Sequence, residues 1–233
     1  MKSHLVLVIP LLMVSNLYAS DRGIIFGQNT RLIMSSDKNA IGIRVGNYNS
    51  TNYLVHAKVV EADHQNITSD NFIISPELSE IKPDTSTVLN IRRIGGQYPN
   101  DRESLVYVVG RFIPKSFTNQ VTSKVELSIT FKMKMFLRPE SLTGGDVIEK
   151  SVNRLDYKYE KDNLIIANNS PYHLTFYKFV INDKEIELPD NVKMLAPFES
   201  KSLKCKFKPK VITWSLIGDG GFETAQVTRN ITN

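Results

Sequence analysis

The feature of this sequence that most restricts its fold is an alternation of apolar and polar residues with a period of two, which is longest in Val125–Met135. Successive side chains of a β-strand point to opposite faces, so one face of this segment requires burial and the other requires water. Shorter β-branched and aromatic runs of the same kind recur before it, at residues 41–45, 53–59, 87–92 and 105–109. Short strands separated by turn residues predict a β-sandwich.

Helical periodicity is weak throughout. The nearest candidate, residues 149–159, is short and has no clean apolar stripe. We therefore expect an all-β protein.

A break in the pattern divides the chain in two. Pro139 cannot donate to a strand ladder, and Gly144–Gly145 interrupts regular structure. Strand-like runs then resume, at residues 163–168, 173–177, 202–207 and 213–217. A chain of 233 residues suits two small domains better than one large one. We predict domains at residues 20–141 and 142–233.

The first 19 residues have the composition of a signal peptide. Lys2 supplies a positive start, a short apolar stretch follows, and Ala19 and Ser20 are small residues at a polar boundary. The stretch is too short to span a bilayer as a helix. A buried N-terminal strand is the alternative, and cleavage after either Ala19 or Ser20 stays open. We expect an exported, soluble protein.

Cysteine content and charge exclude several classes of protein. Cys205 is the one cysteine, so an intramolecular disulfide is impossible, and we expect a buried thiol in a strand. The formal net charge of +5 is mild, and no dense basic block appears. The sequence therefore predicts no nucleic-acid partner.

Catalytic motifs are not apparent. The four histidines are scattered, with His56 and His173 in alternating runs where a solvent-facing or hydrogen-bonded role is expected. Ser104 has no flanking glycines, so it does not form a nucleophile elbow. The glycine-rich residues 218–221 lack the Lys-Ser/Thr pair of a phosphate-binding loop. We predict no enzymatic activity, no catalytic residue, no cofactor and no metal.

Several ordered motifs resemble those of the periplasmic pilus chaperones of the chaperone–usher system, the PapD-like family. The matching segments are Asp101–Tyr107 (DRESLVY), Arg111–Pro114 (RFIP), Phe131–Pro139 (FKMKMFLRP), Ala167–Phe176 (ANNSPYHLTF), Met194–Phe198 (MLAPF) and Trp214–Gly221 (WSLIGDGG). The family usually has Glu where Phe112 stands and a second Pro where Lys115 stands.

The resemblance implies two immunoglobulin-like domains set at an angle, with a cleft that binds pilin subunits in the periplasm before delivery to an outer-membrane usher. This family is itself a known example of that sandwich and of β-strand addition.

The resemblance also assigns roles to individual residues. Arg31 matches the family's first-strand arginine and Lys134 its cleft lysine, which together anchor the C-terminal carboxylate of the pilin. Two cations in a partly desolvated cleft bind a carboxylate well through charge-assisted hydrogen bonds. Either residue could instead be an ordinary solvated charge on a strand.

The zigzag segment matches the strand that the family donates to an incomplete pilin. By this resemblance the donated apolar residues are Val125, Leu127, Ile129 and Phe131. The alternative is that the whole apolar face, continued by Met133, packs inside its own sandwich. We expect the residues nearer Met135 to do so.

Glu103, Arg138 and Asp219 match a family triad that joins the two domains by ion pairing. If this network is exposed, it adds little stability and serves to fix the interdomain angle. The connecting loop Lys115–Lys124 and the single cysteine favour the short-loop branch of the family.

Two other uses of the fold remain open from the residues alone. The chain could be a secreted two-domain immunoglobulin-like adhesin or ligand-binding module, which would bind through its end loops and donate no strand. The apolar edge could also be capped by a second copy in a homodimer, since an unoccupied apolar strand is a liability.

Overall fold

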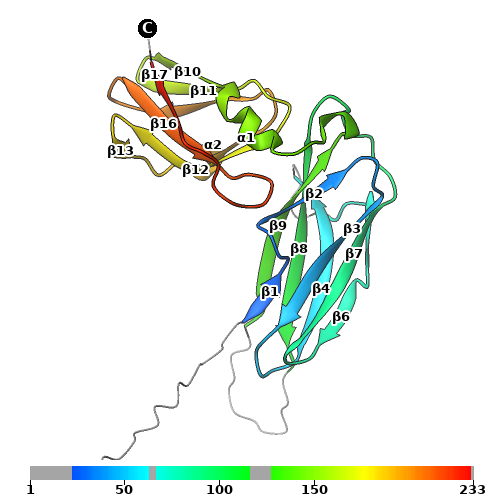
Figure 1. The fold of residues 1–233 in the computed structure, drawn as a ribbon. Helices are drawn as coiled ribbons and strands as arrows, with labels where there is room; N and C mark the ends of the chain where they lie inside the picture. The colour runs from blue at the N-terminus through cyan, green and yellow to red at the C-terminus, as the bar shows by residue number, and fades with distance from the viewer. Residues whose placement is uncertain (1–22, 63–66, 116–126, 232–233) are drawn as a thin grey trace, which may run out of the picture.

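The structure is a computed structural model that describes residues 23–62, 67–115 and 127–231. The predicted leader, Val125 and most of the loop Lys115–Lys124 lie outside these residues, so the expectations for them remain untested. The described chain forms two β-sandwich bodies joined at an angle (Figure 1). Among the described residues, no helix is long and apolar enough to cross a membrane.

Two sheets packed face to face make up the first body. One sheet has the strand order β1 (Ile24–Phe26), β3 (Ala40–Asn47), β7 (Thr85–Arg93) and β5 (Phe72–Ser75). The other has the order β2 (Arg31–Ser35), β9 (Ile129–Arg138), β8 (Ser104–Pro114), β4 (Tyr53–Glu61) and β6 (Leu78–Ile81). The chain crosses between the sheets from β1 to β2, so that β2 lies beside β9 in parallel.

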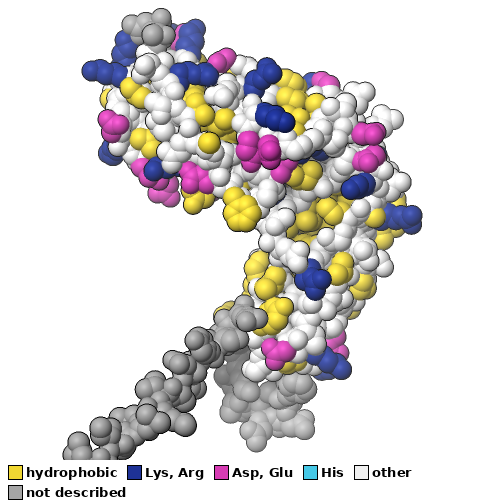
Figure 2. Space-filling view, viewed as in Figure 1, with side chains coloured by type: hydrophobic (Ala, Val, Ile, Leu, Met, Phe, Trp, Pro, Cys, Tyr) yellow, Lys and Arg dark blue, Asp and Glu magenta, His cyan; other side chains and the backbone are white. Residues whose placement is uncertain are grey.

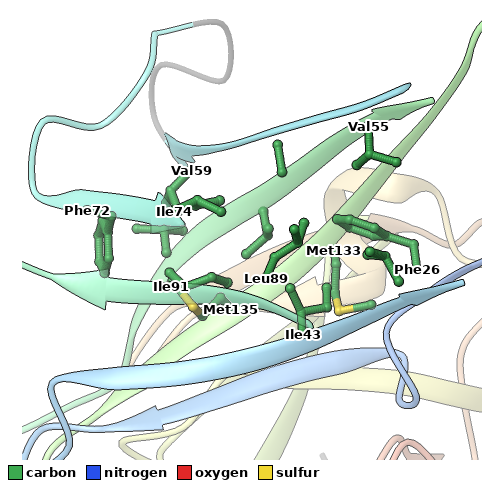
Figure 3. Packing of buried hydrophobic residues seen from close by; sticks show 14 of the residues in the cluster. Phe26, Ile43, Val55, Val59, Phe72, Ile74, Leu89, Ile91, Met133 and Met135 are labelled. Atoms are coloured by element: carbon green, nitrogen blue, oxygen red, sulfur yellow. The ribbon is translucent and has the colours of Figure 1, made fainter. Parts of the chain in front are cut away.

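Period-two burial builds the core of this first body. Along β4, for example, Val55, Ala57 and Val59 are buried while the residues between them are less so. Figure 3 shows Val55 and Val59 in the same cluster as Ile43 and Leu89 of the opposite sheet. The alternating runs at 41–45, 53–59, 87–92 and 105–109 all lie inside strands of this body.

A second, separate core lies in the second body. Its sheets have the orders β10 (Leu155–Glu160), β11 (Asn163–Asn168), β15 (Ser200–Lys204) and β13 (Lys184–Glu185), β12 (Leu174–Ile181), β16 (Val211–Leu216), β17 (Val227–Asn230). A short strand β14 (Met194–Leu195) pairs with β12. Trp214 is fully buried at its centre, and its indole N–H donates to the carbonyl of Val152 at 3.0 Å.

Short helices connect the strands. They are α1 (Val147–Ser151), α2 (Asp190–Lys193) and the 3-10 turns η1 (Glu140–Leu142) and η2 (Val152–Arg154). The region 149–159, the nearest helical candidate in the sequence, is helical only at its start and then enters β10. Cys205 is buried as expected but lies one residue beyond β15, where its thiol donates to the carbonyl of Phe207 at 2.9 Å.

Candidate functional site

Arg31 and Lys134 lie opposite each other at the point where β2 begins. They are Cα partners in the parallel pairing of β2 with β9. The Arg31 side chain is only 4% exposed; one terminal nitrogen donates to the carbonyl of Ile217 at 3.0 Å, and the guanidinium lies 5.5 Å from the centre of the Phe136 ring. Its Nε is buried without a hydrogen-bond partner, and no carboxylate of the described residues forms an ion pair with it. The guanidinium is therefore held in place, and its Nε–H is left without an acceptor.

Lys134 adds a second positive charge in the same place. Burial lowers its pKa, and the charges of Arg31 and Lys193 lower it further, while Asp190 opposes them. Lys193 and Asp190 belong to α2, so Lys134 faces the second body. Burial likewise lowers the pKa of Arg31. The charges of Asp219 and Glu103 oppose the effect of burial on the Arg31 pKa, so the main cost at both cations is desolvation. An incoming carboxylate that accepts hydrogen bonds from both cations would offset this cost.

The described part of the zigzag is not a strand over its whole length, because β9 begins at Ile129 and Leu127 precedes it. Burial of its apolar face increases along the chain. Leu127 is 74% exposed, Ile129 is 39% exposed and Phe131 is half-buried, whereas Met133 and Met135 are buried. The buried end belongs to the first body's own core. Within the described part of the zigzag, large apolar side chains are thus exposed to water only at the end remote from the second body.

Phe131 stands at the transition. Its ring stacks on Phe26 with centroids 5.8 Å apart and meets Phe112 edge to face at 5.4 Å. The residue opposite it on β8, Gly110, leaves space for the Phe26 ring, which a Cβ at that position would overlap. Phe131 therefore packs partly against the core of the first body and is partly exposed, whereas Leu127 and Ile129 are exposed.

The strand neighbours of β9 change at the same transition. On one side β8 pairs with it from Ile129 to Leu137. On the other side β2 pairs only with Lys134–Arg138. Beside the residues of β9 that precede Lys134, the edge that β2 covers farther along the strand is therefore not paired with any strand among the described residues. Figure 2 shows hydrophobic side chains along the concave side of the molecule, on the strands of the first body and on the facing surface of the second.

An ion-paired network joins the two bodies. Arg138 donates through Nε to Glu103 at 2.7 Å and through both terminal nitrogens to Asp219 at 2.6 and 2.8 Å. Arg138 and Glu103 are buried, and the side chain of Asp219 is 26% exposed, so the case of an exposed network that adds little stability does not apply. Burial would lower the pKa of Arg138, but its bonds to Asp219 and Glu103 raise it above the usual value.

Two further residues contribute to this junction, His173, for which the sequence left a hydrogen-bonded role open, and Ile217, which was not singled out. The backbone N–H of His173 donates to Glu103 Oε2 at 2.8 Å, and the His173 ring lies 5.1 Å from that of Phe136. The carbonyl of Ile217 accepts from Arg31. His173 and Ile217 fall inside matched motifs, but backbone donors and acceptors leave no signal in residue types. The remaining described histidine, His56, is exposed and lies 3.1 Å from Glu77.

Comparisons with protein families match nearly the whole described chain. Residues 25–143 match the N-terminal domain of PapD, the pili and flagellar-assembly chaperone, and residues 150–228 match the C-terminal domain of the pili assembly chaperone PapD. The probable fimbrial chaperone LpfB of Escherichia coli O157:H7 is 27% identical over 205 residues, covering 87% of each chain. The probable fimbrial chaperone protein ElfD of Escherichia coli K12 is 27% identical over 220 residues, covering 93% of this chain and 91% of its own.

Solved structures have the same fold. A chain in the Salmonella enterica SafA pilin complex with the SafB chaperone superposes with a TM-score of 0.79 at 24% identity, covering 90% of this chain and 96% of that one. The periplasmic chaperone SfaE superposes with a TM-score of 0.73 at 25% identity, covering 90% and 100%. These matches favour the chaperone interpretation over the adhesin alternative. The chain belongs to the PapD-like pilus-assembly chaperones of the chaperone–usher pathway.

Proposed function

We propose that this chaperone captures a pilin-type subunit by holding the subunit's C-terminal carboxylate between Arg31 and Lys134 and by lending it the segment at residues 125–131, which leads into the start of β9. The observation that carries the proposal is the position of the two cations, which lie opposite each other where β2 begins and the zigzag face starts to be exposed. The family is periplasmic and is not known for enzymatic activity.

Desolvation of the two cations supports the carboxylate step. Arg31 is buried with its Nε unpartnered, and burial depresses the pKa of Lys134. A carboxylate that accepts hydrogen bonds from both would offset this cost, and such charge-assisted bonds are roughly twice as strong as neutral ones. In the unoccupied protein the cost remains, which favours binding of an anion at this place.

The lent strand supports the second step. The subunit chain would pair with the uncovered edge of β9 and end at Arg31 and Lys134. It would then run parallel to β9, as β2 does. Leu127 and Ile129 would then enter a groove of the subunit, each gaining about 1.5–3 kcal/mol if fully buried. Backbone hydrogen bonds along the strand would fix the register. We include Val125 and Phe131 in the lent face, and an outer-membrane usher as the acceptor of the complex.

Glu103, Arg138 and Asp219 would hold the second body at the angle that this arrangement requires, since their bonds cross the junction. The two bodies correspond, in this proposal, to domains at residues 20–141 and 142–233, preceded by a leader at residues 1–19.

The test is capture of a pilin-type subunit in the periplasm. The tagged chaperone is co-produced with the subunit, and the recovered complex is quantified for wild type, Arg31→Ala and Lys134→Ala. We expect both variants to lose the complex while their far-ultraviolet circular dichroism stays unchanged. Lys82→Ala, which removes an exposed lysine from the turn before β7, is the charge-matched control. Normal recovery from either cleft variant would contradict the mechanism, as would capture of a subunit extended beyond its natural C-terminus.

A second copy of the chain is the other candidate for the exposed edge, because Leu127 and Ile129 are large apolar side chains in water. Such a homodimer would cap the edge until a subunit arrives. Sedimentation of the free protein tests it: a dimer should dissociate on Leu127→Glu substitution and on addition of the subunit.

A further inference from the structure

Phe222 has no place in either core. It is 79% exposed, more than any other large hydrophobic residue among those described, and it belongs to the turn 218–222 that follows β16. Isolated apolar residues on a surface are common and by themselves mean little. What distinguishes Phe222 is how firmly its backbone is held and what lies beside it.

The turn that carries Phe222 is closed by its own hydrogen bonds. The N–H of Gly218 donates to the carbonyl of Phe222 at 2.8 Å, and the N–H of Gly221 donates to that of Gly218 at 2.9 Å. A bridge between Ile217 and Glu223 follows immediately. Asp219 ties the same turn to Arg138 of the first body. The Phe222 ring is therefore exposed, but the backbone that carries it is fixed by hydrogen bonds.

The turn also touches the first body beside the cation pair. At Gly221, where φ is +85°, a Cβ would lie 2.9 Å from Oγ1 of Thr30, the residue before Arg31. Arg31 itself donates to the carbonyl of Ile217, at the base of the turn. Figure 1 shows this loop, in red, reaching from the second body to the start of β2. Since adjacent Cα atoms are about 3.8 Å apart, the Phe222 side chain starts within a few ångströms of this contact.

We propose that Phe222 contacts an apolar side chain among the last residues of the captured subunit, next to the carboxylate held by Arg31 and Lys134. The inference rests on the proposed function, because it takes the subunit's C-terminus to lie at the cation pair. A large apolar or aromatic residue close to the subunit's C-terminus would bury the Phe222 ring, whereas a small or polar one would leave it in water. Phe222 would thus select among subunits that all present the same carboxylate.

Peptide binding separates the two claims. The probes are three fluorescently labelled 14-residue peptides with alternating Val and Thr. One has Phe as its apolar residue nearest a free C-terminal carboxylate, one has Ala there, and the third is the Phe peptide with a C-terminal amide. Dissociation constants are measured by anisotropy for wild type, Phe222→Ala, Phe222→Leu and Phe207→Ala. Phe207 is a control because it is another partly exposed phenylalanine, in the connection between β15 and β16.

We expect wild type to bind the Phe peptide about tenfold more tightly than the Ala peptide, which corresponds to about 1.4 kcal/mol. Phe222→Ala should abolish this preference and leave the affinity for the Ala peptide unchanged. The effects of Phe222→Ala in the chaperone and of the Phe-to-Ala change in the peptide would then be coupled and not additive. Phe222→Leu should restore part of the preference, and Phe207→Ala should keep it all.

Three outcomes would overturn the inference. Phe222→Ala could leave the preference intact, weaken both carboxylate peptides equally, or alter only self-association of the free protein. The proposed function fails by a different result: wild type that binds no peptide, or binds the amide as well as the carboxylate, would remove the cation pair as the anchor.

Discussion

The guanidinium of Arg138 donates to both carboxylate oxygens of Asp219 across the domain junction, at 2.6 and 2.8 Å. The same guanidinium reaches Glu103 behind it, and Glu103 in turn accepts from the backbone N–H of His173. A bidentate pair has a fixed geometry as well as a charge. The junction is therefore fixed by directional bonds, and the turn that carries Asp219 takes its position from them.

Removing the central cation of this network should destabilise the protein strongly. Arg138→Met would leave the buried carboxylate of Glu103 without its partner, at a cost of about 3–5 kcal/mol. Asp219→Asn should cost less, because the Asp219 side chain is partly exposed. Urea unfolding followed by the fluorescence of Trp214, the single tryptophan, measures both. Equal midpoints for Arg138→Met and wild type would show that the network contributes nothing to stability.

Substitution of Lys134 should separate stability from capture. Burial and the neighbouring cations lower the Lys134 pKa, so its charge is an unfavourable feature of the free protein at neutral pH. Lys134→Met should therefore leave the free energy of unfolding unchanged or raise it by up to about 1 kcal/mol, since the side chain is partly exposed. The same variant should lose subunit capture. Urea midpoints and complex recovery measured on the same preparations check the pair, and a clear loss of stability would contradict the argument.

Subunit binding should weaken at alkaline pH, and the weakening should begin at a lower pH than it would if Lys134 had the ordinary lysine pKa. The free-state pKa of Lys134 is lowered from 10.5, and a bound carboxylate would raise it again, so binding takes up a proton once pH exceeds the free-state pKa. Affinity for a carboxylate peptide should be constant near neutrality and then fall by up to tenfold per pH unit. Arg31 stays charged throughout this range. Anisotropy titrations between about pH 6 and 10.5 test this, and Lys134→Met should flatten the profile.

Much of this architecture could be predicted from the pattern of residues, and the unpredicted parts have physical causes. Alternation places the strands because it reflects one-sided burial, and it locates β4, β7, β8 and β9. The expectation that the zigzag residues nearer Met135 pack inside their own sandwich is confirmed. The alternation alone does not give the residue at which burial changes to exposure, because β2 covers β9 only from Lys134 onward. Burial of the Arg138 network depends on how the second body covers it. The sequence did not single out Phe222, because its proposed role depends on its position beside Thr30 and Arg31, which only the tertiary structure gives.

A charge at the exposed end of the zigzag should impair capture without harming the fold. Leu127→Glu would bring a carboxylate into an apolar groove of the subunit, where an unpaired charge is costly. Val88→Glu is the matched control, since Val88 is also partly exposed but lies on β7 in the opposite sheet. We expect complex recovery to fall at least tenfold for Leu127→Glu only. Equal recovery from both variants would move the lent segment away from Leu127.

A methyl group at Gly110 should damage both the core and the lent strand. Gly110 lies opposite Phe131, and a Cβ there would overlap the Phe26 ring that Phe131 stacks on. Phe26 must then shift, at a cost of about 1–3 kcal/mol for overpacking. Gly145→Ala is the control, since a Cβ at Gly145 meets nothing within 4 Å, and it should be neutral or slightly stabilising. Urea unfolding measures the cost. Because Phe26 supports Phe131, subunit capture by Gly110→Ala should weaken in parallel, and a destabilised variant with normal capture would show that Phe131 serves its own core alone.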